Sequence, residues 1–254
     1  MKRLDTKTAV IFGATGGIGG AIARGFVQEG ATVIPVSRNE ESVRAAVSEL
    51  NALGNRFTEI ICCDVTRQDQ VEQVCARTAE LFGRIDIMAC VSGAYIKKPA
   101  TDISLDEWNT VLNTNLTGTF ITNQAAGKYM LKQGKGSIIN IGSLGSDVAL
   151  SNTLPYCASK AGVVMVTKCL SSEWAGSGVR VNTIIPGVFP TNLNRKALSD
   201  PVRVENIIKR TPIKRLGAVD ELAGAAIFLA SDDSAFVTGI ALPVDGGFLA
   251  FSGF

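Results

Sequence analysis

Short apolar runs rich in β-branched residues recur along the whole chain, and longer segments with helical spacing separate them. Such runs are typical of strands that are buried on both faces of a parallel sheet. They predict seven parallel strands, at residues 8–12, 32–36, 58–63, 85–90, 137–141, 180–185 and 240–244.

The segments between these runs place apolar residues three and four positions apart, which gives a helix one apolar stripe to pack against a sheet. Ser104 and Glu107 have the spacing of a capping box and predict the start of one helix. Another predicted helix carries the stripe Val71, Val74, Cys75, Thr78, Leu81 and Phe82. The alternation predicts an α/β, Rossmann-like, doubly wound sheet with helices on both faces and a ligand site beyond the carboxyl ends of the strands.

No internal repeat or low-complexity linker interrupts the pattern, so residues 1–254 are expected to form a single domain. One connection, residues 188–215, is longer and more polar than the others. Proline residues interrupt regular structure in this connection and just before it, at Pro186, Pro190, Pro201 and Pro212. We predict that this segment is a lid over the substrate.

The charge balance narrows the class of partner. Lys and Arg number 25 against 23 Asp and Glu, and no dense basic run appears, which argues against a nucleic-acid or membrane partner and favours a small molecule. No apolar stretch approaches the roughly 20 residues of a membrane span, and no signal-peptide pattern precedes the first strand. A cytoplasmic protein is therefore expected.

Histidine is absent, which excludes Ser-His-Asp and Cys-His catalysis and removes the commonest metal ligand. The six cysteines show no C-x-x-C spacing and are interpreted as structural, so no metal site is expected. Acid–base chemistry must fall to tyrosine, lysine or carboxylates.

A glycine-rich segment between the first predicted strand and the following helix carries Gly13, Thr15, Gly17, Ile18 and Gly19. Free backbone amides at a helix N-terminus bind anions, so this segment is a candidate site for a pyrophosphate. A simple glycine-rich turn is the alternative, and the position within a βαβ unit favours the phosphate site.

Tyr156 and Lys160 lie four positions apart in a helical stretch, so their side chains project from one face. A free phenol has a pKa of about 10, and a neighbouring ammonium lowers it toward the range that a general base needs. The pair is therefore predicted to transfer a proton between an alcohol and a carbonyl. An exposed helix pair is the alternative, but Ser143 stands thirteen positions upstream, just past a predicted strand.

The G-x-x-x-G-x-G spacing, the Ser143–Tyr156–Lys160 spacing and Asn115 together resemble the short-chain dehydrogenase/reductase family over nearly the whole chain. The resemblance implies that Tyr156 donates a proton in reduction and that Ser143 stabilises the substrate oxygen. It further implies that Lys160 binds the nicotinamide ribose and that Asn115 keeps a water that links Lys160 to solvent.

The residues after the second predicted strand indicate the form of the cofactor. An NAD enzyme of this type would carry a carboxylate there, whereas this chain has Ser37 and Arg38, which suit a 2′-phosphate. NADP(H) is therefore expected rather than NAD(H). The alternative makes Arg38 a surface residue that pairs with Glu40 or Glu41.

The resemblance also assigns the remaining cofactor contacts. They are Asp64 and Val65 at the adenine, Gly93 beside the cofactor, and Pro186, Gly187, Val188 and Thr191 at the nicotinamide. Helix capping is the alternative role for Asp64. The chain departs from the family at Cys90-Val91-Ser92, where Asn-Asn-Ala is common and where the lost asparagine ties neighbouring strands together.

The C-terminal tail resembles those of gluconate and sugar-acid dehydrogenases, so a ketone/alcohol oxidoreductase acting on a small hydroxy or keto compound is expected, as a homotetramer. One alternative is a 3-oxoacyl-[acyl-carrier-protein] reductase, and another is an NADP(H) sensor without turnover. An acidic carrier would need the basic residues Lys97, Lys98, Arg195, Lys196, Arg203, Lys209 and Arg210. The substrate pocket is expected to include Tyr95, Val148, Leu150, Phe189, Leu193 and Leu198.

Overall fold

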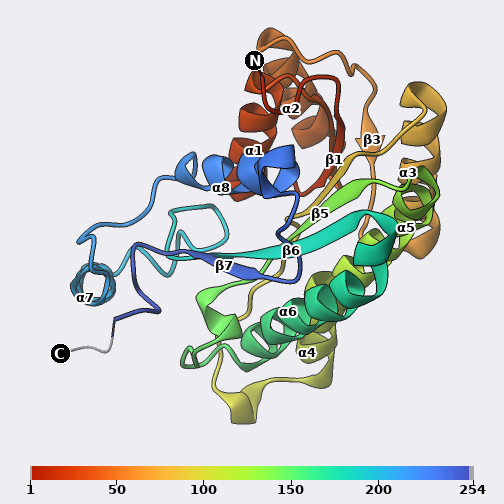
Figure 1. Cartoon of the computed structure of the whole chain (residues 1–254). Coiled ribbons are helices and arrows are strands. Elements are labelled where there is room, and N and C mark those ends of the chain that lie inside the picture. Colours follow the sequence, from red (N-terminus) through yellow and green to blue (C-terminus); the bar gives the residue numbers. More distant parts are fainter. Residues whose placement is uncertain (1, 252–254) are drawn as a thin grey trace.

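A computed structural model describes residues 2–251 of the chain (Figure 1). Seven parallel strands form one sheet in the order β3-β2-β1-β4-β5-β6-β7, which confirms the predicted doubly wound fold. The strands are β1 (Thr8–Phe12), β2 (Thr32–Ser37), β3 (Ile61–Cys62), β4 (Ile87–Cys90), β5 (Gly136–Ile141), β6 (Val179–Pro186) and β7 (Ala241–Val244).

The prediction for the third strand was wrong in length, because β3 keeps only two of the six residues expected at 58–63. The reason is the side chain of Asn55, which binds the backbone of β2, 22 positions earlier in the chain. Asn55 accepts a hydrogen bond from the Val33 amide at 2.8 Å and donates one to the Val33 carbonyl at 2.9 Å. Since Asn55 satisfies the backbone groups that a longer β3 would pair with, the edge strand is short.

Eight α-helices connect the strands across residues 2–251 and cover both faces of the sheet (Figure 1). None of them is both long and apolar enough to cross a bilayer. Alternate β1 residues serve the two cores: Ala9 and Ile11 face α1 and α8, whereas Val10 and Phe12 face α3 and α5. The helices are α1 (Gly17–Gln28), α2 (Glu40–Ala52), α3 (Gln68–Phe82), α4 (Leu105–Leu112), α5 (Gly118–Gln133), α6 (Leu154–Trp174), α7 (Pro201–Arg210) and α8 (Glu221–Ala230).

The start of α4 confirms the predicted capping box. Ser104 Oγ accepts from the Glu107 amide at 3.2 Å, and the Glu107 carboxylate accepts from the Ser104 amide at 2.8 Å. A π-helical turn, Asn113–Thr117, then joins α4 to α5. This turn places Asn115 near the carboxyl ends of the strands. Single π-helical turns are frequent at functional sites.

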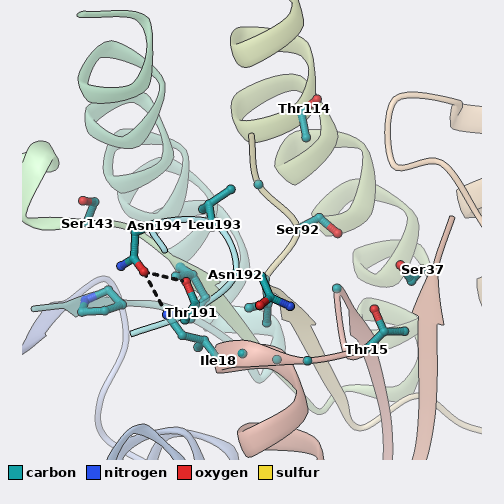
Figure 2. Close-up of a pocket in the computed structure, with 18 of the residues that line it drawn as sticks. Thr15, Ile18, Ser37, Ser92, Thr114, Ser143, Thr191, Asn192, Leu193 and Asn194 are labelled. Atoms are coloured by element: carbon teal, nitrogen blue, oxygen red, sulfur yellow. Dashed lines mark hydrogen bonds between the residues drawn. The ribbon is translucent and has the colours of Figure 1, made fainter. Parts of the chain in front are cut away.

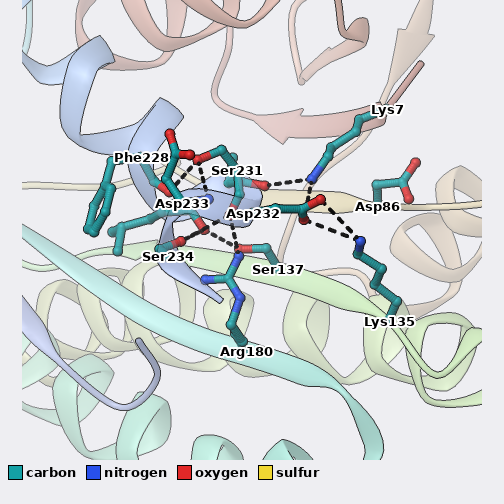
Figure 3. Close-up of polar contacts among 12 residues, drawn as sticks. Lys7, Asp86, Lys135, Ser137, Arg180, Phe228, Ser231, Asp232, Asp233 and Ser234 are labelled. Carbon is teal, nitrogen blue, oxygen red and sulfur yellow. Dashed lines mark hydrogen bonds and ion pairs between the residues drawn. The ribbon is translucent and has the colours of Figure 1, made fainter. Parts of the chain in front are cut away.

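The amino ends of the strands are held by paired charges (Figure 3). Asp232, after α8, accepts from Lys7 at 3.0 Å and pairs with Lys135 at 3.2 Å, so it joins the approaches to β1 and β5. Arg180 of β6 donates to the carbonyl of Ser231 at 3.1 Å. Asp86, ahead of β4, accepts from the Thr8 amide at 2.8 Å. Lys7, Lys135, Arg180, Asp86 and Asp232 at this end therefore all find ion-pair or hydrogen-bond partners within the protein.

Candidate active site

A ligand-sized groove at the carboxyl ends has a volume of about 390 Å³ and runs from Ser37 to Ser143 (Figure 2). Residues that are far apart in the sequence meet along it, as the fold predicts. Sixteen predicted site residues line it, whereas Asn115 and Val188 do not. The sixteen are Gly13, Thr15, Gly17, Ile18, Gly19, Ser37, Arg38, Asp64, Val65, Gly93, Ser143, Tyr156, Lys160, Pro186, Gly187 and Thr191.

The glycine loop folds tightly against itself at the start of α1. A Cβ on Gly19 would lie 2.0 Å from the Gly13 carbonyl oxygen, so only glycine fits there. Gly17 has a φ of +52°, which other residues rarely adopt. No side chain caps α1, and its first turn contains no acidic residue. The amides at this helix end can therefore bind an anion.

At the Ser37 end of the cavity, Arg38 makes no ion pair with any residue between 2 and 251. The alternative partner Glu40 pairs with Arg44 instead, at 2.7 Å. Asp64 does not cap a helix, since its carboxylate accepts from the Thr66 amide at 2.9 Å. Burial raises the pKa of Asp64, but the Thr66 hydrogen bonds and the Arg38 charge outweigh it and lower that pKa overall.

At the other end, Lys160 is buried and its Nζ donates to the Ile141 carbonyl at 2.7 Å. The same Nζ lies 5.9 Å from the centre of the Tyr156 ring. Tyr95 packs edge-on against Tyr156, with ring centres 5.1 Å apart. Ser143 stands at the end of β5, where its Oγ accepts from the Gly145 amide at 3.1 Å. Three of the four predicted catalytic side chains therefore meet at one end of the cavity.

The pKa values of Tyr156 and Lys160 differ from the prediction. Burial raises the pKa of the Tyr156 phenol, and the Ser143 hydroxyl opposes this rise without reversing it. Burial also lowers the pKa of Lys160 to about 8. Lys160 does not depress the phenol pKa here, because its ammonium is itself desolvated and bonded to a carbonyl. Both groups are held away from their ordinary acidities, as is common at catalytic sites.

Asn115 lies behind the cavity wall and is fully buried. Its Oδ1 accepts from the Ala94 amide at 2.7 Å, and its Nδ2 donates to Ser159 Oγ at 3.0 Å. A Cβ on Gly93 would lie 3.5 Å from Asn115 Oδ1 and 3.9 Å from Lys160 Nζ. Asn115 thus holds the segment around Gly93 in place, and its role in a water relay stays a prediction.

The departure at Cys90 is accommodated by the surrounding side chains. Cys90 Sγ lies 2.9 Å from Thr122 Oγ1, and burial raises the pKa of this thiol to about 12. One strand further along, Asn140 accepts from Asn123 at 3.0 Å and donates to Thr167 at 2.9 Å. Buried polar links therefore join the sheet to α5 and α6 without the family's asparagine.

A family model described as enoyl-(acyl carrier protein) reductase matches residues 13–249, which include the whole lining of the cavity. The chain belongs to the short-chain dehydrogenase/reductase family. It is an oxidoreductase that acts on CH–OH groups.

Three relatives illustrate the range within the family. D-threitol dehydrogenase of Mycolicibacterium smegmatis is 43% identical over 247 residues, with 97% of this chain and 94% of that protein covered. The 3-oxoacyl-[acyl-carrier-protein] reductase of Thermotoga maritima is 38% identical, with 96% and 98% covered. A crystal structure of a gluconate 5-dehydrogenase from Burkholderia cenocepacia, in complex with NADP and tartrate, has a TM-score of 0.94 and 38% identity, with 98% and 97% covered.

The predicted lid segment, residues 188–215, contributes cavity residues that were missed in the sequence. Asn194 accepts from the Thr191 amide at 2.9 Å (Figure 2). It also donates to the Phe189 carbonyl at 2.8 Å. The polar run at 191–194 was a usable signal, because asparagine side chains often close such turns. The missed lining residues include Gly16, Ser92, Thr114, Asn192 and Asn194.

Two of the expected apolar lining residues, Phe189 and Leu193, do line the cavity. Leu150 instead lines a small separate cavity with Leu154 and Cys157. Val188 also lies elsewhere, since its carbonyl accepts from the Gly217 amide at 3.0 Å.

Three of the seven basic residues considered for a carrier protein have partners of their own in this dehydrogenase/reductase. Lys98 pairs with Glu107 at 3.0 Å, and Lys209 pairs with Glu205 at 2.7 Å. The guanidinium of Arg210 lies 4.6 Å from the centre of the Phe248 ring. These partners leave fewer free charges for an acidic protein surface than the sequence indicates.

Proposed function

We propose that this protein is a cytoplasmic, NADP(H)-dependent dehydrogenase/reductase that interconverts a secondary alcohol and a ketone on a small polyhydroxylated compound. One observation carries the proposal. A single cavity joins the glycine loop and Arg38 at one end to Ser143, Tyr156 and Lys160 at the other. A dinucleotide along this cavity would place its reactive ring beside the proton-transfer residues.

The residues fit such a cofactor. The uncapped start of α1 would hold the pyrophosphate, and Ser37 and Arg38 would hold a 2′-phosphate. Arg38 forms no ion pair with any residue between 2 and 251, so its charge is available to a phosphate, which supports NADP(H). The NADP bound to the gluconate 5-dehydrogenase relative supports it too. When bound, the cofactor supplies or accepts the hydride.

The protein residues handle the proton. In reduction, Tyr156 Oη would donate its proton to the carbonyl oxygen, and Ser143 Oγ would hydrogen-bond that oxygen as negative charge develops on it. The raised pKa of Tyr156 keeps the phenol protonated for this step. In oxidation the phenol must first ionise, and the Lys160 ammonium, 5.9 Å from the centre of the Tyr156 ring, would favour that ionisation if it approached the phenol.

The relatives support a small hydroxylated substrate, since two of them act on threitol and gluconate by their names. A 3-oxoacyl-[acyl-carrier-protein] reductase remains the second candidate because of the relative from Thermotoga maritima. The pairing of Lys98 and Lys209 with acidic neighbours disfavours it. Intact Ser143, Tyr156 and Lys160 disfavour a sensor without turnover.

We propose a homotetramer as the working assembly. Large apolar side chains are exposed on the outward faces of α4, α5 and α6, at Leu105, Phe120, Leu154 and Met165. Exposed apolar area of this kind is typical of protein contacts. A monomer in light scattering would contradict this part of the proposal.

The test follows oxidation of NADPH and NADH at 340 nm with polyol-derived ketones, keto sugar acids and 3-oxoacyl thioesters. Tyr156→Phe is expected to lower kcat by about 10²- to 10⁴-fold, because the proton donor is lost, while NADPH affinity is retained. Tyr129→Phe is the matched control, because Tyr129 lies in α5 and packs against the core between the sheet, α3 and α5, outside the cavity. Full turnover by Tyr156→Phe would refute the mechanism.

A further inference from the structure

Arg203 lies in the first turn of the lid helix α7, which stands outside the two helical layers (Figure 1). Its Nε is buried and has no hydrogen-bond partner in the structure. Across residues 2–251, no carboxylate lies within ion-pair distance of its guanidinium. A buried donor without an acceptor is unfavourable, so native structures rarely keep one without a ligand or another reason.

The surroundings of Arg203 connect it to the catalytic end of the cavity. Its guanidinium lies beside the Tyr95 hydroxyl, where it lowers the pKa of that phenol against the larger rise that burial causes. The Tyr95 ring in turn packs edge-on against Tyr156, with 5.1 Å between ring centres. One phenol side chain therefore separates an unpaired cation from the residue that transfers the proton.

A second, open cavity of about 400 Å³ adjoins α7 and is lined by Arg203, which does not line the first cavity. The carboxylate of Asp200 lines it too, but this group accepts from the Val202 amide at 3.0 Å and the Arg203 amide at 3.3 Å. Arg210 is stacked on Phe248. At this place the Arg203 guanidinium thus lies against the Tyr95 hydroxyl, and no carboxylate between residues 2 and 251 pairs with it.

We propose that Arg203 binds a carboxylate of the substrate and so makes the enzyme prefer sugar acids to neutral polyols. The inference rests on the proposed function and adds the substrate class and the residue that selects it. A guanidinium presents two parallel N–H donors that match the two oxygens of a carboxylate. Because the Tyr95 ring intervenes, the carboxylate must lie several bonds from the carbon that reacts.

The experiment compares two six-carbon substrates with NADPH: 5-ketogluconate, which carries a carboxylate, and D-fructose, which is neutral. Arg203→Gln is expected to lower the ratio of kcat/KM for the acid to kcat/KM for the ketose by about 10- to 100-fold, mainly through KM. Arg203→Lys should give an intermediate ratio, because lysine keeps the positive charge but lacks the two parallel N–H donors of the guanidinium.

Lys209→Gln is the matched control, since it removes one charge from the same helix at an exposed, ion-paired position. Its ratio should equal that of the wild type. Unaltered NADPH affinity in Arg203→Gln shows that the variant is folded. An equal loss on both substrates, or no change in the ratio, would overturn the role of Arg203 and leave the proposed function standing.

Absence of turnover by the wild type on both substrates would count against the proposed function, and direct binding then decides the role of Arg203. Isothermal titration of the NADP⁺-loaded protein with gluconate gives this second readout. Binding that is lost in Arg203→Gln and kept in Lys209→Gln supports the carboxylate site. Binding that is absent from the wild type, or unaffected by Arg203→Gln, overturns it.

Discussion

The two ends of the sheet treat charge in opposite ways. At the amino ends, Lys7 and Lys135 share Asp232, so the chain provides its own partners (Figure 3). At the carboxyl ends, Arg38 has no ion pair among the described residues, and Lys160 is bonded to a carbonyl rather than to a carboxylate. Polar groups that a fold leaves without partners mark the place where a ligand completes the structure.

Ser137 and Ser143, at opposite ends of β5, give the sharpest comparison between the two ends of the sheet. Ser137, at the amino end of β5, donates to the Leu229 carbonyl at 2.8 Å, whereas Ser143 follows the carboxyl end and faces the cavity. Ser143→Ala is expected to lower kcat by about 10²- to 10³-fold, because a donor to the developing oxyanion is lost. Ser137→Ala should lower the free energy of unfolding by about 1 kcal/mol and leave kcat unchanged. Steady-state kinetics and urea unfolding measure both, and reversed effects would contradict the comparison.

Lys160 should reveal its burial in the pH dependence of stability. Its pKa is about 8 in the folded protein without cofactor and 10.5 when exposed. Below pH 8 both states carry the proton, so the burial of the charge destabilises the fold. Between pH 8 and 10.5 only the unfolded state keeps the proton, so stability should rise with pH, by at most about 3 kcal/mol.

Urea unfolding of the wild type and Lys160→Met at several pH values measures this rise. The difference between the two curves should shrink as the pH rises. Lys168→Met, at an exposed lysine of the same helix, is the control and should follow the wild type. Parallel curves for the wild type and Lys160→Met would show that Lys160 keeps its ordinary pKa.

Arg38 tests the adenosine end of the cavity. Arg38→Ala should lower kcat/KM for NADPH by about 10- to 100-fold, since charge-assisted hydrogen bonds to the phosphate are lost, and should change the value for NADH little. Arg44→Ala removes a charge nearby, but from a residue already paired with Glu40. It should alter neither value. A preference ratio unchanged by Arg38→Ala would refute the phosphate contact.

Asp232 should show the smallest effect, because its ion pairs are exposed. Asp232→Asn breaks the contacts with Lys7 and Lys135, and the expected loss of stability is below about 1 kcal/mol. The loss should fade in high salt. Steady-state kinetics should be unchanged, and a clear loss of activity would mean that the two ends of the sheet are coupled.

Much of the fold was predictable because its signals are local. Apolar runs locate the strands, and the spacing of Ser104 and Glu107 locates a helix start. The length of β3 was not predictable, because it depends on Asn55 reaching back to Val33. Contacts between separate elements likewise have no signature in a single sequence.

The same division holds in the site. The glycine loop and the Tyr156–Lys160 pair have recognisable spacings, and the structure brings them into one cavity. The contact of Tyr95 with Tyr156 joins the loop after β4 to helix α6 and is invisible in the sequence. The raised phenol pKa was missed because spacing alone says nothing about desolvation.

The hydrogen bonds of Asn194 close the lid loop on itself, through Thr191 and Phe189. Backbone hydrogen bonds fix its two ends: the Gly187 amide donates to the Val244 carbonyl of β7, and the Gly217 amide donates to the Val188 carbonyl, which joins the two ends to each other. A loop with internal bonding and fixed ends behaves as a cassette. We expect that exchanging the segment between these contacts for that of a relative transfers substrate preference. The glycine loop, Arg38 and Tyr156 stay unchanged, whereas Thr191 is exchanged with the segment.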